Sequence, residues 1–309
     1  MAGIRAAVVV HPASGRGRAG RVADIVATRL QDQVGDLITD LVTVRVNTVE
    51  ESRRLMGRAH DAGLDLVVVV GGDGSAHQGV QFCAERDVAL AVIPAGTGND
   101  LARTLGAPAD PVAAADALVE DLLADRFTRI DLGRIEGEPA GSRWFAGVLC
   151  AGFDSAVNER ANRMRWPSGP RRYDLAIVAE MARLRPGRLT VEQDGVRTEG
   201  EATQIAVGNI RHYGGGIPIC PAADPTDGLF DLTLVGPASR LDLVRMLPGL
   251  RTGRHVEHPA VTTSRAGRVR LGEANGWVAY ADGERIGPLP VEVTCVPKAL
   301  NVVGRVVSD

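Results

Sequence analysis

Two short glycine-rich segments contain the residues best suited to phosphate chemistry, and each directly follows an apolar run. The first is Gly71-Gly72-Asp73-Gly74-Ser75, which follows the apolar residues 66–70. Its glycines let backbone N–H groups approach an anion, the Ser75 hydroxyl can donate to it, and a following helix would add its positive N-terminal end. The carboxylate of Asp73 would repel a bare phosphate but would attract an intervening Mg²⁺. The segment therefore predicts a phosphate site with magnesium.

A second segment, Pro94-Ala95-Gly96-Thr97-Gly98-Asn99-Asp100, repeats the pattern after the apolar residues 88–93. Thr97 lies between two glycines and can donate to phosphate, whereas Asn99 or Asp100 can cap the helix that follows. A third segment, residues 11–17, follows the first apolar run, and its Ser14 can contact a nucleotide. None of the three has the Gly-x-x-x-x-Gly-Lys pattern of a P-loop, and residues 11–17, which form the first strand-to-helix turn, lack a clean dinucleotide-binding fingerprint.

Carboxylates in the second half can serve acid–base or metal chemistry, although each also has a plain structural explanation. Asp154 follows an apolar stretch and is either functional or a buried helix cap. Asp224 and Asp227 lie in a loop rich in Pro and Gly, where they either hold a hard cation, of a structural more than a catalytic kind, or face solvent. The turn Asp282-Gly283-Glu284 can present an acid to a cleft, or it is a hairpin turn with solvated acids.

The elements that must position these residues change in character near residue 130. Before it, apolar strands alternate with helices. The strands are expected at residues 6–10, 41–46, 66–70 and 88–93, and the helices end near residue 30 or cover 50–62, 79–85, 100–105 and 112–123. This order predicts an α/β domain with a doubly wound, mostly parallel, Rossmann-like sheet that has helices on both faces.

After residue 130, short strands are separated by Gly and Pro. They are expected at residues 204–208, 229–235, 268–271 and 291–294, with a helix at 174–184. This pattern predicts a mostly antiparallel β domain with a few helices. We expect domains over residues 1–130 and 131–309, with about the last 10 residues returning to the first domain. No low-complexity linker separates the two domains, which predicts close packing around a cleft.

Composition narrows the class of protein. A chain of 309 residues suits two domains, and its net charge of −3 argues against a nucleic-acid binder. The four cysteines form no Cys-x-x-Cys pair, which favours reduced thiols in the cytoplasm over disulfides or zinc. No apolar run approaches the ~20 residues that cross a bilayer, and the N-terminus looks like a first strand and not a signal peptide. Any membrane contact is therefore expected to be peripheral.

One stretch departs from the slightly acidic average. Residues 160–188 contain eight arginines and two acids, together with Trp166 and Tyr173. Such a stretch either docks on anionic lipid headgroups or is a solvated helix face.

Taken together, these segments resemble the diacylglycerol kinase catalytic-domain family, which includes bacterial lipid kinases and is related to the sphingosine kinases. The resemblance extends over essentially the whole chain, and the Asp73 and Thr97 loops are specific in combination. The second half matches at Gly152-Phe153-Asp154, Gly208-Asn209, Gly214-Gly215-Gly216, Pro221-Ala222, Asp227-Gly228-Leu229 and Asp282-Gly283-Glu284. The sequence departs from the family pattern at three positions. His11 and His77 stand where the family usually has Asn, and Ser75 replaces Thr but keeps the hydroxyl.

The resemblance implies an ATP-dependent kinase that transfers the γ-phosphate to a lipid hydroxyl, with diacylglycerol, giving phosphatidic acid, as the first candidate. A sphingoid base, phosphatidylglycerol or another lipid alcohol stays open. ATP with Mg²⁺ would bind the first domain and the lipid the interdomain cleft. The expected nucleotide contacts are Ser14, Thr48, Gly71, Gly72, Asp73, Gly74, Ser75, Ala76, His77, Gly96, Thr97 and Asp282.

The resemblance also implies roles in catalysis and metal binding. Glu284 would be the general base for the lipid hydroxyl, with Asp154 nearby and Asp73 next to Mg²⁺. A family metal site would fall on Asp224, Asp227 and the carbonyl of Leu229.

Two other classes compete with a lipid kinase. A soluble NAD kinase shares the Gly-Gly-Asp-Gly loop but needs an Asn-Glu dipeptide after a later strand, for which Asn99-Asp100 is the nearest equivalent. A non-catalytic lipid-binding regulatory module is the second, and the intact Asp73, Ser75, Thr97 and Glu284 argue against it. We expect no nucleic-acid partner, and a homodimer is left open.

Overall fold

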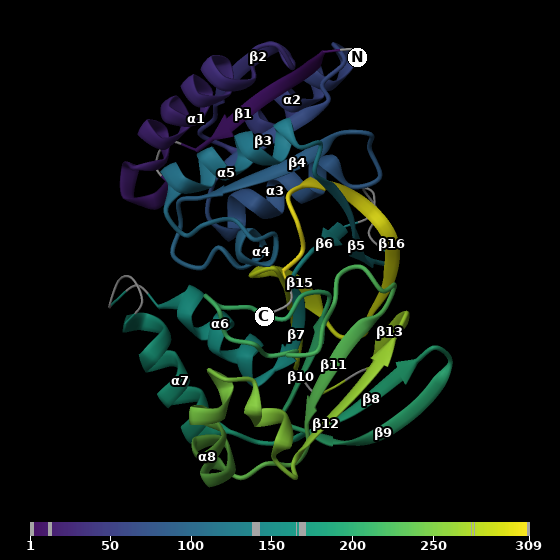
Figure 1. Ribbon diagram of the computed structural model, residues 1–309. Coiled ribbons are helices and arrows are strands. Elements are labelled where there is room, and N and C mark those ends of the chain that lie inside the picture. Colours follow the sequence, from purple (N-terminus) through teal and green to yellow (C-terminus); the bar gives the residue numbers. More distant parts are fainter. Residues whose placement is uncertain are drawn as a thin grey trace.

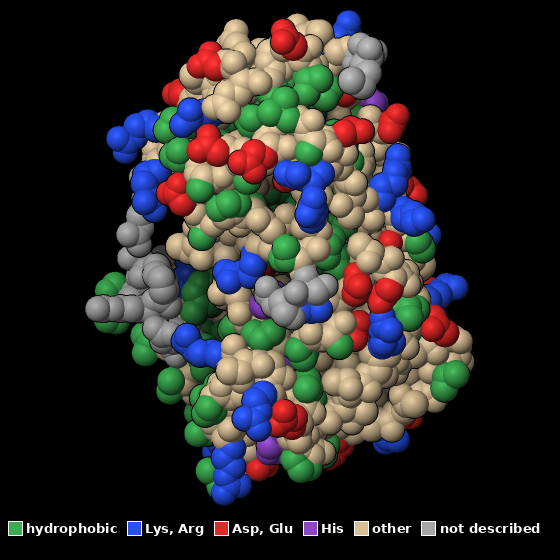
Figure 2. Space-filling view, viewed as in Figure 1, with side chains coloured by type: hydrophobic (Ala, Val, Ile, Leu, Met, Phe, Trp, Pro, Cys, Tyr) green, Lys and Arg blue, Asp and Glu red, His purple; other side chains and the backbone are tan. Residues whose placement is uncertain are grey.

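The structure, a computed structural model, describes residues 3–11, 14–137, 143–164, 166, 171–272, 274 and 276–307. Figure 1 shows two domains, the first above the second in this view, with β16 running from one to the other. Basic and acidic side chains are interspersed over the visible face of both domains (Figure 2). Within the described residues, no helix is long and apolar enough to span a membrane.

Four parallel strands form the centre of the first domain, in the order β2-β1-β3-β4. Their bounds are Ile4–Val10 for β1, Ile38–Arg45 for β2, Leu66–Gly71 for β3 and Ala89–Pro94 for β4. Successive side chains of a strand face opposite helical layers. Thus Val8 packs with α1 (Ala19–Val34) and α5 (Pro111–Leu123), whereas Val9 packs with α2 (Val49–Asp61) and α3 (Asp73–Cys83). The expected doubly wound, mostly parallel sheet is confirmed.

The second domain is a sandwich of strands. One of its sheets is antiparallel, in the order β12-β11-β10-β7-β14-β15. These strands are β7 (Val148–Gly152), β10 (Gln204–Gly208), β11 (Phe230–Val235), β12 (Val261–Ala266), β14 (Val278–Ala281) and β15 (Glu284–Pro288). The facing layer contains β5 (Phe127–Ile135), β6 (Arg143–Phe145), β8 (Gly187–Gln193), β9 (Val196–Ala202), β13 (Arg268–Leu271) and part of β16 (Val291–Val303).

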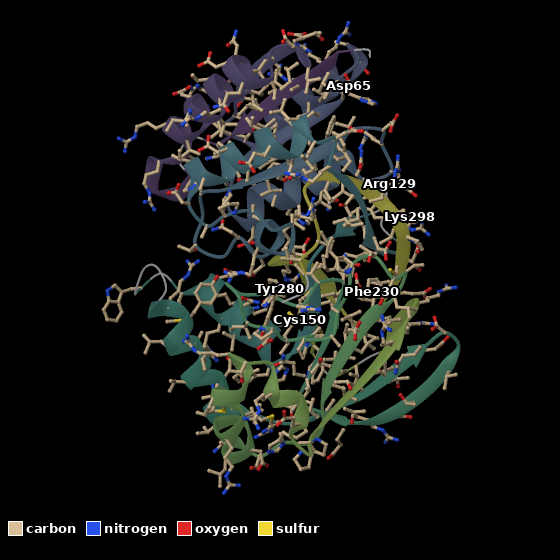
Figure 3. All side chains as sticks on the ribbon, viewed as in Figure 1. Asp65, Arg129, Cys150, Phe230, Tyr280 and Lys298 are labelled. Atoms are coloured by element: carbon tan, nitrogen blue, oxygen red, sulfur yellow. The ribbon has the colours of Figure 1, made fainter. Side chains whose placement is uncertain are left out.

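The core of the second domain lies between these two layers. Phe145 from one layer stacks on Phe230 from the other, with ring centroids 5.5 Å apart. Figure 3 labels Phe230 among the strands of this domain. Aliphatic side chains from both sheets surround this pair. The expected mostly antiparallel second domain is therefore confirmed.

β16 joins the two domains. It pairs antiparallel with β5 and β13, and Val302 near its end pairs in parallel with Leu90 of β4. One sheet therefore continues from β2 in the first domain to β9 in the second. The expected boundary at residue 130 falls inside β5, and the boundary itself stays a prediction.

The remaining helices complete the frame of the site. They are η1 (Ser14–Gly17), α4 (Asp100–Thr104), α6 (Phe153–Arg163), α7 (Arg171–Arg183), α8 (Arg240–Leu250) and η2 (Arg254–Glu257). The expected helix at residues 79–85 is wrong in its start, because α3 begins at Asp73 directly after the first glycine segment. Gly79 lies within α3, and a Cβ there would lie 2.7 Å from Leu90 of the sheet, so this glycine allows close helix–sheet packing.

Candidate active site

The two glycine segments meet at the carboxyl edge of the parallel sheet. Gly71 at the end of β3 pairs with Pro94 at the end of β4, so the loops start side by side. A Cβ on Gly96 would lie 2.5 Å from the Cα of Gly72, and one on Gly98 would collide with Asp73 Oδ2. Only glycine permits these approaches. The structure therefore places the two loops in contact.

Asp73 connects the two loops. Its Oδ2 accepts the backbone N–H of Asn99 at 2.9 Å, and its Oδ1 accepts that of Asp100 at 2.7 Å. Asn99 adopts a left-handed conformation with φ of 59°, and its side chain forms hydrogen bonds with both the N–H and the carbonyl of Gly96. The carboxylate of Asp73 therefore has a structural task that the sequence did not reveal. Its expected contact with Mg²⁺ stays a prediction.

The other expected nucleotide contacts of the first domain lie at the same edge. Ser14 begins η1 after β1, and its N–H donates to the carbonyl of His11 at 2.9 Å. Thr48 follows β2 and caps α2, because its Oγ1 accepts the N–H of Glu51 at 3.1 Å. His11 joins these two loops through Nε2, which lies 3.0 Å from the carbonyl oxygen of Asn47. Loops after all four strands thus surround one edge, where open α/β sheets bind their ligands.

A triple-glycine turn of the second domain closes over this edge. Asp100 Oδ2 accepts the N–H of Gly215 at 2.9 Å, and an added Cβ on Gly215 would lie 3.8 Å from Gly98 Cα. Burial raises the pKa of the Asp100 carboxyl above its usual value, and the adjacent Asp73 carboxylate adds to the rise. Its other oxygen, Oδ1, is buried and has no hydrogen-bond partner among the described residues. The sequence indicates Asp100 as a helix cap or as part of Asn99-Asp100, the nearest equivalent of the NAD kinase dipeptide, and does not indicate its contact with Gly215.

Asp154 lies in a buried polar cluster at the other end of this turn. Its Oδ2 accepts hydrogen bonds from Gln204 Nε2 at 2.6 Å and from the hydroxyl of Tyr213. Burial raises the pKa of Asp154 to about 6, against the lowering effect of these two donors. The helix cap that the sequence allowed for Asp154 is not observed. The N-cap residue of α6 is Gly152, and the carboxylate of Asp154 accepts from the side chains of Gln204 and Tyr213. Tyr213 and Gln204 were missed because they lie at least 50 residues from Asp154 in the chain.

The raised pKa of Asp154 predicts a stability that depends on pH. The folded carboxyl titrates at about 6 and the unfolded one at 3.8, so the folded chain holds a proton that the unfolded chain releases between these values. Stability contributed by this group therefore falls as the pH rises through this window. Asp154→Asn keeps an oxygen that accepts both hydrogen bonds but carries no charge. At pH 8 we expect this variant to be more stable by up to about 3 kcal/mol, with the difference lost at pH 4.

Urea unfolding at pH 4, 6 and 8 measures this effect. Asp87→Asn is the matched control, because the Asp87 side chain is 98% exposed. An equal stability difference between Asp154→Asn and the unaltered protein at all three pH values would show that Asp154 stays ionised when folded.

The turn that carries Glu284 is held against α3. Asp282 Oδ1 and Oδ2 accept the N–H groups of Gly147 at 2.8 Å and Ala146 at 3.0 Å, and His77 Nδ1 lies 3.2 Å from Oδ2. His77 is one helical turn beyond Asp73 on α3, so the contact brings the β14–β15 turn toward the glycine loops. Glu284 is exposed at the start of β15, and its side chain has no hydrogen bond or ion pair with another described residue. It is therefore available to a ligand.

The acids of the expected loop metal site are engaged in other contacts. Asp224 Oδ1 accepts from the N–H and hydroxyl of Thr226, at 3.0 and 2.6 Å. Asp227 accepts the N–H of Leu229 at 3.0 Å through Oδ1 and forms an ion pair with Arg265 through Oδ2. No group of three His, Cys, Asp or Glu side chains is placed to hold a metal, as far as the described chain shows. Both carboxylates are therefore engaged by neighbouring groups, and the metal at Asp224, Asp227 and the carbonyl of Leu229 stays a prediction.

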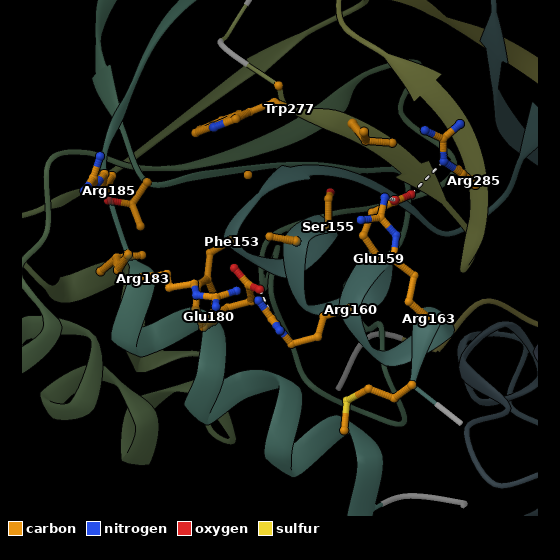
Figure 4. A pocket seen from close by; sticks show the side chains of 17 residues that line it. Phe153, Ser155, Glu159, Arg160, Arg163, Glu180, Arg183, Arg185, Trp277 and Arg285 are labelled. Atoms are coloured by element: carbon orange, nitrogen blue, oxygen red, sulfur yellow. Dashed lines mark hydrogen bonds and ion pairs between the residues drawn. The ribbon is translucent and has the colours of Figure 1, made fainter. Parts of the chain in front are cut away.

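A pocket of about 600 Å³ opens in the second domain beside the Glu284 strand. It lies between α6, the end of α7 and β14, and Arg285 of β15 forms part of its wall. Figure 4 shows Arg285 paired with Glu159, and Arg160 paired with Glu180, across its floor. Apolar walls come from Phe153, Met164, Leu184, Trp277 and Val278. This pocket has the size of a small-molecule site and combines apolar walls with fixed charges.

The fold and the site define a class of protein. A parallel sheet that gathers glycine loops at its carboxyl edge, in contact with a β-sandwich, matches a two-domain kinase. The chain belongs to the diacylglycerol kinase family, because residues 5–135 match the diacylglycerol kinase catalytic domain and residues 147–304 match the YegS C-terminal NAD kinase beta sandwich-like domain.

Curated relatives support this family, and a solved structure shares the fold. The chain is 43% identical over 298 residues to a diacylglycerol kinase of Mycobacterium tuberculosis (strain ATCC 25618 / H37Rv), covering 96% of this chain and 93% of that protein. It is 25% identical over 303 residues to a diacylglycerol kinase of Bacillus subtilis (strain 168), covering 97% and 96%. The fold is similar to the crystal structure of a diacylglycerol kinase from Bacillus anthracis str. Sterne, with a TM-score of 0.76, 21% identity, and 99% and 98% of the two chains covered.

Proposed function

We propose that this kinase transfers the γ-phosphate of ATP to the hydroxyl of a lipid, with diacylglycerol as the acceptor and phosphatidic acid as the product. The observation that carries the proposal is the contact between the Asp73 and Thr97 loops and the Gly215 turn. This contact brings the glycine loops of the first domain against the part of the second domain that contains Asp154 and Glu284, which supports an anion site there.

The phosphates of ATP would bind where N–H groups and hydroxyls gather. The N–H groups at the start of α3 and the hydroxyls of Ser75 and Thr97 are the donors. Asp100 suits a magnesium ion, directly or through water, because its buried Oδ1 has no hydrogen-bond partner in the described chain and Asp73 lies beside it. Magnesium, when bound, would neutralise charge on the phosphate oxygens.

Glu284 is the proposed general base. Its carboxylate accepts the proton of the acceptor hydroxyl, whose oxygen forms a bond to the γ-phosphorus while the bond to the β–γ bridging oxygen breaks. The products are ADP and a phosphorylated lipid. The Asp282 contacts with His77, Ala146 and Gly147 hold this turn in place, and phosphoryl transfer depends mainly on such positioning.

The pocket beside Arg285 supports a lipid as the acceptor. Its apolar side chains can cover acyl carbons, and Arg285 directly follows Glu284 on β15. A soluble NAD kinase is the alternative that the name of the matched second domain keeps open.

An acceptor panel with γ-labelled ATP tests the proposal. The unaltered protein is assayed with diacylglycerol, monoacylglycerol, a sphingoid base, phosphatidylglycerol and NAD, with and without magnesium. We expect label in phosphatidic acid, with at least about tenfold higher kcat/KM for diacylglycerol than for any other acceptor. Label in NADP alone would support an NAD kinase. Binding of lipid without any label transfer would support a regulatory module.

A further inference from the structure

Exposed apolar side chains of the second domain gather on two helices. Among the large apolar side chains that are exposed after residue 131 in the described chain, all but Val196 and Val307 lie on or near α7 and α8. Those near α7 are Trp166, Tyr173, Leu175, Ile177 and Val178, and those on α8 are Leu241, Val244 and Leu247. Clustered exposed apolar surface of this kind marks an interaction site more often than scattered single residues do.

Both helices are amphipathic with one apolar row directed to solvent. On α8, the residues Leu241, Val244 and Leu247 recur every three positions, whereas Met246 is buried. On α7, Leu175 and Val178 are also three apart, and the buried Ala176 packs against α6. Residues three apart share one face of a helix. The inward faces of both helices therefore pack on the domain through residues such as Met246 and Ala176. The exposed rows have no packing partner in the described chain.

The two rows belong to one side of the molecule. Arg240 at the start of α8 donates through Nη2 to the carbonyl of Ala182 near the end of α7, at 2.6 Å. Figure 1 shows α7 and α8 next to each other at the left of the second domain. In Figure 2, hydrophobic side chains line the left edge of the second domain, where Figure 1 places α7. We call the exposed residues Leu175, Val178, Leu241, Val244 and Leu247 the α7–α8 face.

Positive charge borders the α7–α8 face. Arg183 and Arg185 at the end of α7 and Arg251 after α8 are exposed and have no ion pair within the described chain. Two of the acids nearby are engaged, because Glu180 pairs with Arg160 and Asp242 accepts from Ser239 in the capping box of α8. Residues 165 and 167–170 of the arginine-rich stretch lie outside the described residues. Apolar helix rows bordered by arginines match the chemistry of an anionic bilayer surface.

We infer that the α7–α8 face docks on an anionic membrane, with its apolar rows at the level of the acyl chains and its arginines at the headgroups. The pocket near Glu284 supports this orientation, because Arg183, Leu184 and Arg185 at the end of α7 belong to its wall. A membrane bound at this face would adjoin the pocket, so a lipid could move from the membrane into the pocket without crossing water. The use of the face for substrate supply rests on the proposed lipid kinase function, whereas docking itself does not.

Vesicle binding tests the docking face. Two double variants, Leu175→Asp/Val178→Asp and Leu241→Asp/Val244→Asp, are compared with the unaltered protein by sedimentation with vesicles of equal phosphatidylcholine and phosphatidylglycerol. Leu123→Asp and Val196→Asp are matched controls, because these side chains are 60% and 67% exposed but lie on α5 and β9. Each double variant is expected to weaken binding at least about tenfold, and each control less than about twofold. Vesicles of phosphatidylcholine alone should bind the unaltered protein at least about tenfold more weakly.

A second measurement separates docking from catalysis. Turnover of a short-chain diacylglycerol below its aggregation concentration needs no membrane, so every variant should retain the activity of the unaltered protein. Unchanged vesicle binding by both double variants would overturn the inference, and loss in the α7 variant alone would remove α8 from the face. A change of oligomeric state without loss of vesicle binding would identify a protein interface instead. An unaltered protein that binds vesicles through this face but phosphorylates no lipid would defeat the proposed function and leave the docking face standing.

Discussion

Glu284→Gln is expected to lower kcat by about a thousandfold and to leave the affinity for ATP unchanged. The amide has nearly the shape of the carboxylate but cannot accept the proton of the acceptor hydroxyl. Because the Glu284 side chain is exposed and has no hydrogen bond or ion pair with another described residue, the substitution removes no internal side-chain contact that the structure shows. Steady-state kinetics with labelled ATP, together with equilibrium binding of a non-hydrolysable ATP analogue, measure the two quantities separately.

The matched control for this variant is Glu201→Gln, an exposed glutamate on β9 in the second domain. It should retain full activity, and both variants should unfold at the temperature of the unaltered protein. Full activity in Glu284→Gln would reject Glu284 as the base while leaving the family assignment unaffected.

Asp73→Asn is expected to lower kcat/KM for ATP by about 100-fold or more, through weaker ATP binding as well as slower transfer. The carboxylate accepts N–H groups from both Asn99 and Asp100, at 2.9 and 2.7 Å. An asparagine has one accepting oxygen, so its NH₂ group would face one of these donors. Hydrogen bonds to a charged acceptor are also the stronger kind. We therefore expect the Thr97 loop to separate from the Gly72 loop, with a loss of about 2 kcal/mol in stability.

Asp110→Asn provides a control with similar bonding away from the site. Asp110 caps α5 by accepting two backbone N–H groups, at 3.1 and 3.0 Å. Its substitution tests the loss of a charged acceptor for backbone groups, and it should leave ATP kinetics unchanged. If Asp73→Asn and Asp110→Asn have the same kcat/KM for ATP, Asp73 has no special part in the nucleotide site.

The first domain could be predicted from the sequence because its signals are local. The two glycine segments directly follow the expected strands at 66–70 and 88–93, and successive strands of a parallel sheet usually lie side by side with their carboxyl ends together. The adjacency of Asp73 and Thr97 follows from this rule alone. The start of α3 was missed because the glycines between residues 71 and 74 suggest a loop. Gly79 also weakens the helical pattern in the sequence, although in the structure it lets α3 pack closely on Leu90 of the sheet.

The sequence contains weaker signals for the structure of the second domain and for the contacts between the two domains. The hydrogen bond between Asp100 and Gly215 joins residues 115 positions apart, and no spacing rule predicts it. The cluster around Asp154 depends on Tyr213 and Gln204, which look like ordinary strand and turn residues in the sequence. α8 was missed because it has apolar residues on its solvent side and contains Pro248, so the usual helical pattern is obscured.

The course of β16 limits how this molecule can open. The strand pairs with β5 and β13 and ends beside β4, so swinging the two halves apart would break main-chain hydrogen bonds in a shared sheet. Large hinge closure around substrates, common in other kinases, is therefore costly in this architecture. The short turn at Gly214–Gly216, which has positive φ at all three glycines, is joined to the first domain through Asp100 and can change conformation at lower cost. We therefore expect substrate exchange to depend on a local conformational change of the Gly214–Gly216 turn and not on rotation of whole domains.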